Sequence, residues 1–278
     1  MSRNFKSIVE FGPAAAATLL TRAFARYHVA LPYTPTLFTD MARLDSVDLS
    51  LSRVMLWEDK PAAVALIARR GWTSRLASIA VPEVAINGHA HALLTHLLAD
   101  AAGRGDRFML VEVIEKNLPA VNLYERCGFR KLRRLVCYTG SGGDFSTAET
   151  PEEIDPREFG RLLQVHGPVD LPWQISGETL ALVSPGHTAW RLGHAAVLIS
   201  DSAAPVITIR GLLPDSDRGD RLVTLLKALM ARFPDKEWSA QAIFPEEWST
   251  VFDRLGLQRG SLSQWQMVAA LSEPARSA

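Results

Sequence analysis

The stretch Asn117-Leu-Pro-Ala-Val-Asn-Leu-Tyr-Glu-Arg-Cys-Gly-Phe129 is the most informative part of this chain. Asparagine and an early proline are typical of the start of a helix, and glycine is typical of its end. The pattern therefore predicts a helix from Asn117 to Gly128, followed by a strand that starts at Phe129. Tyr124 falls two turns after Asn117 on the same face of that helix, and the helix boundaries alone do not explain a tyrosine there.

The same stretch resembles the C-terminal signature of the GNAT N-acetyltransferase superfamily, which reads N-x-x-A-x-x-L-Y-x-x-x-G-F. Every letter is present here. In that family the tyrosine faces the sulfur of acetyl-coenzyme A, so the resemblance implies that Asn117, Ala120 and Tyr124 contact this cofactor and that Tyr124 is catalytic. A phenol with a pKa of about 10 can donate a proton to a leaving thiolate. The alternatives are a core tyrosine and, for Asn117, a simple helix cap.

A second stretch, residues 82–94, aligns without a gap with the phosphate-binding loop of the same family, [Q/R]-x-x-G-x-[G/A]. It reads Ala85-Ile86-Asn87-Gly88-His89-Ala90, so Gly88 and Ala90 match while Ala85 replaces the usual basic or amide residue. The resemblance implies that main-chain N–H groups and the helix dipole bind the pyrophosphate of the cofactor. The expected cofactor contacts in this loop are Asn87, Gly88, His89 and Ala90.

The two histidines of this loop region, His89 and His91, have two interpretations. In the first interpretation, one of them replaces the missing basic group near a phosphate. In the second, which we favour, both are exposed residues of a first helical turn. Residues two apart on a helix point away from each other, so they do not form a metal site. No other spacing in the chain predicts a metal site.

The resemblance also implies that the strand ending at Val81 lies beside the acetyl group, with Ile79 and Val81 in contact with the cofactor and a main-chain N–H meeting the oxyanion. For the general base, Glu112 is the first candidate, because burial in an apolar strand raises the pKa of a carboxyl group. Glu83 and Glu115 are alternatives at strand ends. Each of the three has a competing interpretation as a solvated carboxylate, and a water chain can replace a dedicated base.

Hydrophobic periodicity outlines the fold of the first half of the chain. It predicts strands at residues 5–11, 49–57, 62–69, 74–81 and 108–114, the last of them buried on both faces. Helices are expected at 13–27, 37–44 and 88–102. This order is the order of elements in the GNAT fold, so the expected fold class is α+β, a mixed and mostly antiparallel twisted sheet flanked by helices.

The second half of the chain resembles a degenerate repeat of the first. Phe252-Asp-Arg-Leu-Gly-Leu257 mirrors Tyr124-Glu-Arg-Cys-Gly-Phe129 position for position, with Phe252 in place of the tyrosine. Strands are expected at 206–213, 238–244 and 264–271, the last of them closing this half. We therefore expect two tandem GNAT-like domains, an acyltransferase domain at 1–140 and a degenerate one at 154–278, joined by a Gly- and Ser-rich linker at 141–153.

Composition limits the partners of the protein. Lys and Arg together number 30, as do Asp and Glu, so the net charge is zero and nothing points to nucleic acid or a membrane. The two cysteines are too few for a disulfide framework, which fits a cytoplasmic protein. No apolar run approaches the roughly 18 residues of a membrane span. Trp72, Trp173 and Trp190 are expected to fill cores.

The leading hypothesis is an acetyl-CoA-dependent N-acyltransferase that acetylates an amine of a small molecule or a peptide and acts as a monomer or a homodimer. The second hypothesis is a non-catalytic CoA-binding or regulatory protein on the same scaffold, which the departures at Ala85 and Ile86 favour. A third is a different acyl donor, such as a carrier protein or an aminoacyl-tRNA. That donor predicts a basic docking face, of which the balanced charge gives no sign.

Overall fold

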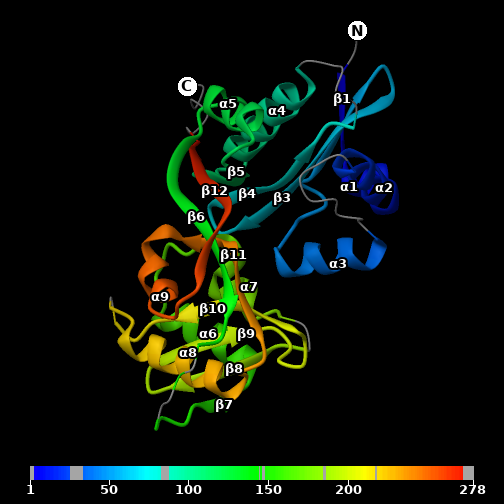
Figure 1. Ribbon diagram of the computed structural model, residues 1–278. Coiled ribbons are helices and arrows are strands. Elements are labelled where there is room, and N and C mark those ends of the chain that lie inside the picture. The colour runs from blue at the N-terminus through cyan, green and yellow to red at the C-terminus, as the bar shows by residue number, and fades with distance from the viewer. Residues whose placement is uncertain are drawn as a thin grey trace. The chain divides into compact units, whose positions relative to one another are not determined.

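The computed structural model describes residues 3–25, 34–82, 88–143, 145, 148–183, 186–216 and 218–271 (Figure 1). The chain divides into two compact units. Unit 1 comprises Met1–Val113, Asn117–Leu132 and Gln266–Ala278, and unit 2 comprises Ile114–Lys116 and Arg133–Trp265. The domain boundaries expected from the sequence stay a prediction.

The sheet of unit 1 is mixed. Its strands follow the order β1 (Arg3–Ser7), β2 (Arg53–Trp57), β3 (Lys60–Arg70), β4 (Thr73–Ala80) and β5 (Phe108–Ile114). The first four are antiparallel neighbours, whereas β4 and β5 are parallel. The pairing of β4 with β5 stops at Leu76 and Val111, although both strands continue. The ends of β4 and β5 are therefore free of each other's hydrogen bonds.

Helices cover both faces of this sheet. The short α1 (Ile8–Phe11) and α2 (Pro13–Phe24) share one hydrophobic cluster with alternate residues of β2 and β3, to which α3 (Pro35–Leu44) adds Phe38. The intervening residues of β2 and β3, such as Met55 and Ala65, point to the other face and are also buried. The helix α4 (His89–Gly103) packs on β2, β3 and β4. Since successive side chains of a strand point to opposite faces, α4 covers the second face.

Unit 2 repeats this plan. Its sheet runs in the order β7 (Glu152–Ile154), β8 (Thr188–Leu192), β9 (Ala195–Ile199), β10 (Val206–Leu213) and β11 (Glu237–Pro245). Here too the fourth and fifth strands, β10 and β11, are parallel over four residue pairs and then separate. The helices of this unit are α6 (Pro156–His166), α7 (Gly177–Leu180), α8 (Asp220–Arg232) and α9 (Ser249–Asp253), with 3-10 turns at Trp173–Ile175 and Glu246–Trp248.

The two halves of the chain exchange their last strands. β6 (Arg130–Ser141), which follows the first helix-and-strand series, pairs antiparallel with β11 of unit 2. β12 (Gln258–Ala270) ends beside β5 of unit 1, where the main-chain N–H of Leu271 donates to the Arg107 carbonyl at 2.9 Å. The strand expected to close the second half thus gives its final residues to unit 1.

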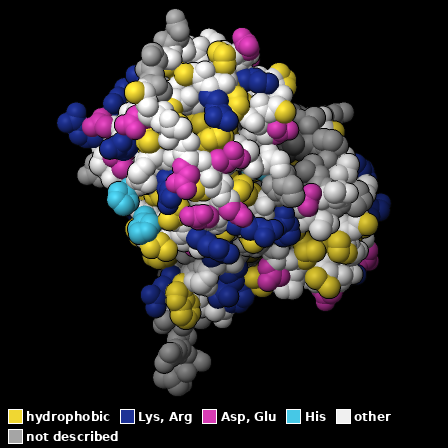
Figure 2. All heavy atoms as spheres, turned by 90° about the horizontal axis from the view of Figure 1, so that it is seen from below, with side chains coloured by type: hydrophobic (Ala, Val, Ile, Leu, Met, Phe, Trp, Pro, Cys, Tyr) yellow, Lys and Arg dark blue, Asp and Glu magenta, His cyan; other side chains and the backbone are white. Residues whose placement is uncertain are grey.

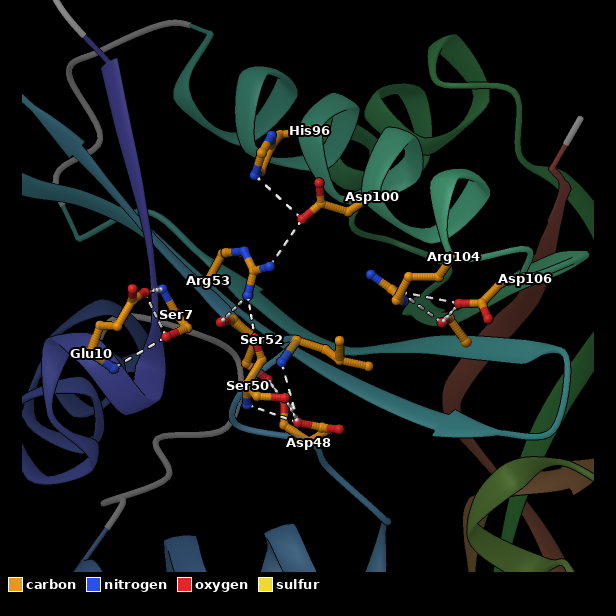
Figure 3. Close-up of polar contacts among 12 residues, drawn as sticks. Ser7, Glu10, Asp48, Ser50, Ser52, Arg53, His96, Asp100, Arg104 and Asp106 are labelled. Carbon is orange, nitrogen blue, oxygen red and sulfur yellow. Dashed lines mark hydrogen bonds and ion pairs between the residues drawn. The ribbon is translucent and has the colours of Figure 1, made fainter. Parts of the chain in front are cut away.

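The strand expected at residues 5–11 is shorter than predicted, because a capping box intervenes. The Ser7 hydroxyl accepts a hydrogen bond from the Glu10 N–H at 3.1 Å, and the Glu10 carboxylate accepts from the Ser7 N–H at 2.8 Å (Figure 3). This reciprocal pair satisfies two N–H groups that a helix start would leave without partners. β1 therefore ends at Ser7, and α1 begins at Ile8.

The strand expected at residues 49–57 starts later, at Arg53. Asp48 accepts hydrogen bonds from the N–H groups of Ser50 at 2.8 Å and Leu51 at 3.2 Å (Figure 3). An aspartate that binds the backbone two and three residues ahead stabilises a turn in place of a strand.

Two expectations about burial were wrong. Trp72 lies in the β3–β4 turn and is 59% exposed, with the Arg107 guanidinium 5.3 Å above its ring. β5 is buried along one face only, since Leu110 and Ile114 are half-buried. Trp173 and Trp190 fill the interior of unit 2 as expected.

A buried carboxylate ties the α4–β5 connection to the sheet. Asp106 accepts hydrogen bonds from Ser74 Oγ at 2.6 Å and Arg69 Nε at 2.7 Å. It also accepts one from Arg104 Nη2 at 3.1 Å (Figure 3). Desolvation acts to raise the pKa of Asp106, but the hydrogen bonds from Ser74 and Arg69 and the charge of Arg104 outweigh it, and the pKa is lowered.

Asp106→Asn is therefore expected to lower the free energy of unfolding by about 1.5–3 kcal/mol at pH 7, because hydrogen bonds to a charged group are lost. A carboxyl group with a depressed pKa stabilises the fold above its unfolded pKa, and that contribution disappears as the pH falls through the folded value. Urea unfolding of both proteins at pH 7 and below pH 4 measures the difference. If the difference in unfolding free energy between the two proteins stays constant with pH, the charged Asp106 carboxylate is not the source of the stabilisation.

Candidate functional site

The helix α4 begins directly after a glycine in a left-handed conformation. The residue before the helix, Gly88, has φ of 103°, a conformation that disfavours residues with a side chain. Among the described residues no side chain caps α4, and its first turn contains no acidic residue. The first N–H groups of a helix have no partners inside it, and the helix dipole favours negative charge there. This end of α4 therefore suits a phosphate.

The matching helix of unit 2, α8, lacks this property. It also follows a left-handed glycine, Gly219, but its first residue is Asp220. The Asp220 carboxylate forms ion pairs with Arg254 at 2.9 Å and with Arg218 at 3.5 Å. A carboxylate already occupies the favourable position for negative charge, so a phosphate at this helix end would meet repulsion.

The end of β4 is accessible, whereas the matching strand end of unit 2 is not. Ile79 and Val81 are half-buried, and the buried Ser78 hydroxyl has no hydrogen-bond partner among the described residues. In unit 2, Leu212 and Leu213 at the end of β10 are 1% and 3% exposed and belong to the core. Among the described residues, the side chains at the end of β4 are therefore less deeply buried than those at the end of β10.

The helix of the opening sequence motif is α5 (Leu118–Arg126). The Asn117 side chain caps it by accepting a hydrogen bond from the Ala120 N–H at 3.3 Å. Tyr124 lies with Val121 on its buried face, 5% exposed, and its ring centroid is 5.6 Å from that of Phe129. Asn117 and Ala120 are half-buried, and the Cys127 thiol at the end of α5 is hydrogen-bonded to Thr95 of α4.

Unit 2 fills the corresponding place with aromatic rings. Phe252, which stands where the motif has tyrosine, is fully buried. Its ring stacks on Tyr138 at 4.8 Å and meets Phe244 edge-on at 5.4 Å. A phenyl group has no proton to donate, so this position of unit 2 has lost the chemistry that the motif implies.

The candidate general bases are already bound by other side chains. Glu112 is buried and its Oε2 accepts a hydrogen bond from Arg75 Nε at 2.7 Å, while Gln266 Nε2 lies 3.5 Å from Oε1. Glu115 is bound by Arg134 and by Ser263. Glu83 lies outside the described residues. The role of Glu112 as a base stays a prediction, and its contacts favour a structural role.

The basic run after α5 is largely neutralised. Lys131 pairs with Glu125, and Arg133 pairs with Asp170. On the face shown in Figure 2, basic and acidic side chains are interspersed. Such a mixture of charges is typical of a solvated surface.

His89 differs from the expected exposed histidine. As the first residue of α4 it is 2% exposed, and its ring lies 5.3 Å from the Trp57 ring, while His91 is exposed as expected. Burial lowers the pKa of His89, and the nearby charge of Arg3 lowers it further. The side chain turns toward the β2–β3 hairpin because the position faces the sheet.

A pocket of about 150 Å³ opens at this point. Val81 and His89, both expected to bind cofactor, line it together with Pro82 and with Trp57, Lys60 and Ala62 of the β2–β3 hairpin. The sequence predicts both strands of this hairpin but does not place them at the site, although strand alternation puts Trp57 on the same face as Met55, toward α4.

The expected site residues thus divide into three groups. Gly88, His89 and Ala90 form the start of α4, Ile79 and Val81 form the end of β4, and Asn117, Ala120 and Tyr124 belong to α5 and its cap. Asn87 and Ala85 lie outside the described residues. Within the described part of the chain, no cluster of three or more His, Cys, Asp or Glu residues could hold a metal ion. No helix in that part is long and apolar enough to span a membrane.

Comparison with known proteins identifies the fold of the chain. Residues 17–129 match the family model described as acetyltransferase (GNAT) family. A GCN5-related N-acetyltransferase from Anabaena variabilis has a TM-score of 0.68 at 13% identity, covering 98% of this chain and 73% of that one. One from Sphaerobacter thermophilus has a TM-score of 0.66 at 13% identity, covering 99% and 98%.

The tandem GNAT protein from the clavulanic acid biosynthesis pathway has a TM-score of 0.61 at 13% identity, covering 99% of this chain and all of that one. At such low identity these likenesses establish the fold, and they confirm the expected α+β class with two tandem repeats. No curated protein matches this sequence.

Proposed function

We propose that this protein is an acetyl-CoA-dependent N-acetyltransferase with its active site in unit 1, since residues 17–129 match the model of the acetyltransferase (GNAT) family. The observation that supports the proposal is the start of α4, where a left-handed glycine precedes a first turn without acidic residues and no described side chain caps the helix, an arrangement that suits a pyrophosphate. The acceptor is an amine of a small molecule or a peptide.

The residues around the ends of β4 and α4 fit the cofactor. The N–H groups that follow Gly88 bind the diphosphate, so the loss of a basic side chain at Ala85 weakens this contact without removing it. Asn117 and Ala120 flank the pantetheine arm, where the half-buried alanine leaves room for it. Ile79 and Val81 border the acetyl end.

Acetyl-coenzyme A supplies an activated thioester when bound. With the cofactor bound, a main-chain N–H at the end of β4 would stabilise negative charge on the thioester oxygen. The Tyr124 hydroxyl would donate a proton to the departing sulfur, and the attacking nitrogen would give up its proton to solvent or to a base. The Arg75 contact makes Glu112 better suited to hold the sheet than to accept that proton.

Titration calorimetry with acetyl-CoA tests the proposal. We expect saturable binding with a dissociation constant in the micromolar range. No heat up to millimolar cofactor overturns the proposal, whereas binding without transfer to any amine favours the non-catalytic alternative.

His91→Asp places a carboxylate in the first turn of α4, on an exposed side chain. We expect the dissociation constant for coenzyme A to rise about tenfold because like charges repel, while the helix itself gains about 0.3–1 kcal/mol. Calorimetry and urea unfolding measure the two effects. The matched control is Asp220→Asn in α8, which is expected to leave affinity unchanged; a larger effect there than at His91 contradicts the assignment of the site to unit 1.

A further inference from the structure

A second pocket, of about 260 Å³, opens in unit 2 at the end of β10. Its polar lining residues are contributed by the last turn of α6, by β8, by the β8–β9 turn and by the segment that follows β10: His166, Arg191, His194 and Asp215. All residues that line it belong to unit 2, and none of them belongs to the candidate acetyl-CoA site. Because small-molecule pockets usually measure about 300–1,000 Å³, this one suits a ligand of few heavy atoms.

Strand register fixes the position of Arg191 in this pocket. Arg191 of β8 and Leu213 of β10 both pair with Ala196 of β9, so the three side chains lie on the same face of the sheet. This is the face that packs against α6, since Ala196 and Leu213 share a hydrophobic cluster with that helix. Two strand spacings, about 10 Å, separate Arg191 from Leu213, and Asp215 follows Leu213 by two residues. Arg191 and Asp215 therefore line one pocket from two different strands.

The two opposite charges in this pocket do not pair with each other. Asp215 is exposed and forms no hydrogen bond or ion pair with any described residue. Arg191 donates to one oxygen of Glu152, from Nη2 at 2.7 Å and from Nε at 3.3 Å. This contact holds the guanidinium in place, while its Nη1 has no hydrogen-bond partner in the described part of the chain. A guanidinium has five N–H donors, so Arg191 can bind a further acceptor.

Such a pair of charges selects a ligand that carries both signs. An anion that is attracted by Arg191 is repelled by Asp215, and a cation meets the reverse, whereas a zwitterion is attracted by both. An α-amino acid carries its ammonium and carboxylate groups on one carbon atom. Leu162 and Leu213 line the same pocket and offer an apolar surface for a side chain.

We propose that this pocket of unit 2 binds a free α-amino acid with an apolar side chain. The carboxylate binds to Arg191, and the ammonium group binds to Asp215. The side chain packs against Leu162 and Leu213. Such binding goes beyond acetyl transfer and does not depend on it, because every residue of the pocket lies in unit 2, whereas the active site is proposed for unit 1.

Leucine is the probe, titrated into the full chain without acetyl-CoA and followed by calorimetry and by the NMR signals of the Leu162 methyl groups. We expect saturable binding with a dissociation constant of about 1 mM. Leucine amide lacks the carboxylate and 4-methylpentanoate lacks the amine, and each is expected to bind at least about tenfold more weakly. Glycine, which lacks the apolar side chain, is also expected to bind more weakly than leucine.

Two variants locate the site and assign its charges. Asp215→Asn and Arg191→Gln are each expected to weaken leucine binding about tenfold. Asp215→Asn should also cease to discriminate against 4-methylpentanoate, and Arg191→Gln should cease to discriminate against leucine amide. Both variants should fold, since exposed ion pairs contribute little to stability. The matched control is Arg259→Gln, which breaks an arginine–glutamate pair outside the pocket and should leave leucine binding unchanged.

Three outcomes overturn the proposal. The first is leucine that fails to saturate at 50 mM. The second is equal affinity for leucine and its two analogues, which removes the opposite charges from the argument. The third is unchanged leucine binding in both pocket variants, which places the amino acid elsewhere, for example at an acceptor site of unit 1. Since none of these measurements uses acetyl-CoA, failure of the acetyltransferase proposal leaves all of them interpretable.

Discussion

Tyr124→Phe is expected to lower the turnover number at least about a hundredfold while leaving the affinity for acetyl-CoA within about twofold. The substitution removes one oxygen, so the packing of the ring against Phe129 and Val121 persists. The proton for the departing thiolate must then come from water. Thiol release with hydroxylamine as a generic nucleophile gives the rate before the natural acceptor is known, and calorimetry gives the affinity.

The matched control is Tyr138→Phe in unit 2. Tyr138 is also buried and stacks on an aromatic ring, that of Phe252, so the two variants lose the same atom from similar surroundings. We expect Tyr138→Phe to retain the turnover number of the wild type. An equal loss in both variants indicates general destabilisation, and an unchanged rate in Tyr124→Phe removes the tyrosine from the chemistry.

Elements with a strong periodic pattern were predictable almost to the residue. The apolar runs at β5 and β10 have the bounds expected from the sequence, because a buried strand needs continuous apolar residues and turn residues at its ends. The errors came from side chains that bind the nearby backbone. Ser7, Glu10 and Asp48 each replace strand pairing by a local hydrogen bond, and hydrophobicity does not register that competition.

Pairing partners distant in sequence were beyond prediction. The alternation of β6 and β12 indicates strands but does not say which neighbour each joins, so the exchange of last strands between the two halves could not be foreseen. The same limit applies to single residues. Glu112 looked like a candidate base because Arg75, 37 positions away in the chain, is invisible to local patterns.

The motif residues of the candidate site were recognisable because backbone geometry fixes them. A left-handed residue before α4 selects glycine at Gly88, and a helix start selects asparagine at Asn117. His89 was misjudged because a polar residue in a first turn is usually exposed, and only the fold shows that this position faces the sheet.

The ion pair between Arg75 and Glu112 should give the largest stability effect in unit 1. Both side chains are almost fully buried, and Arg75 also lies 3.5 Å from Asp45. Arg75→Met removes the guanidinium and leaves the carboxylate in the interior, so we expect the free energy of unfolding to fall by about 3–5 kcal/mol. Urea unfolding at pH 7 measures the loss.

The double variant Arg75→Met, Glu112→Met distinguishes a structural pair from a catalytic base. Replacing both charges by apolar groups of similar volume removes the desolvation cost together with the attraction, so the double variant should recover most of the stability that Arg75→Met loses. If Glu112 is only structural, this recovered protein also keeps its turnover number and pH–rate profile. A stable double variant without activity would instead return Glu112 to the role of base, and a double variant as unstable as the sum of the single changes would show that the two residues act independently.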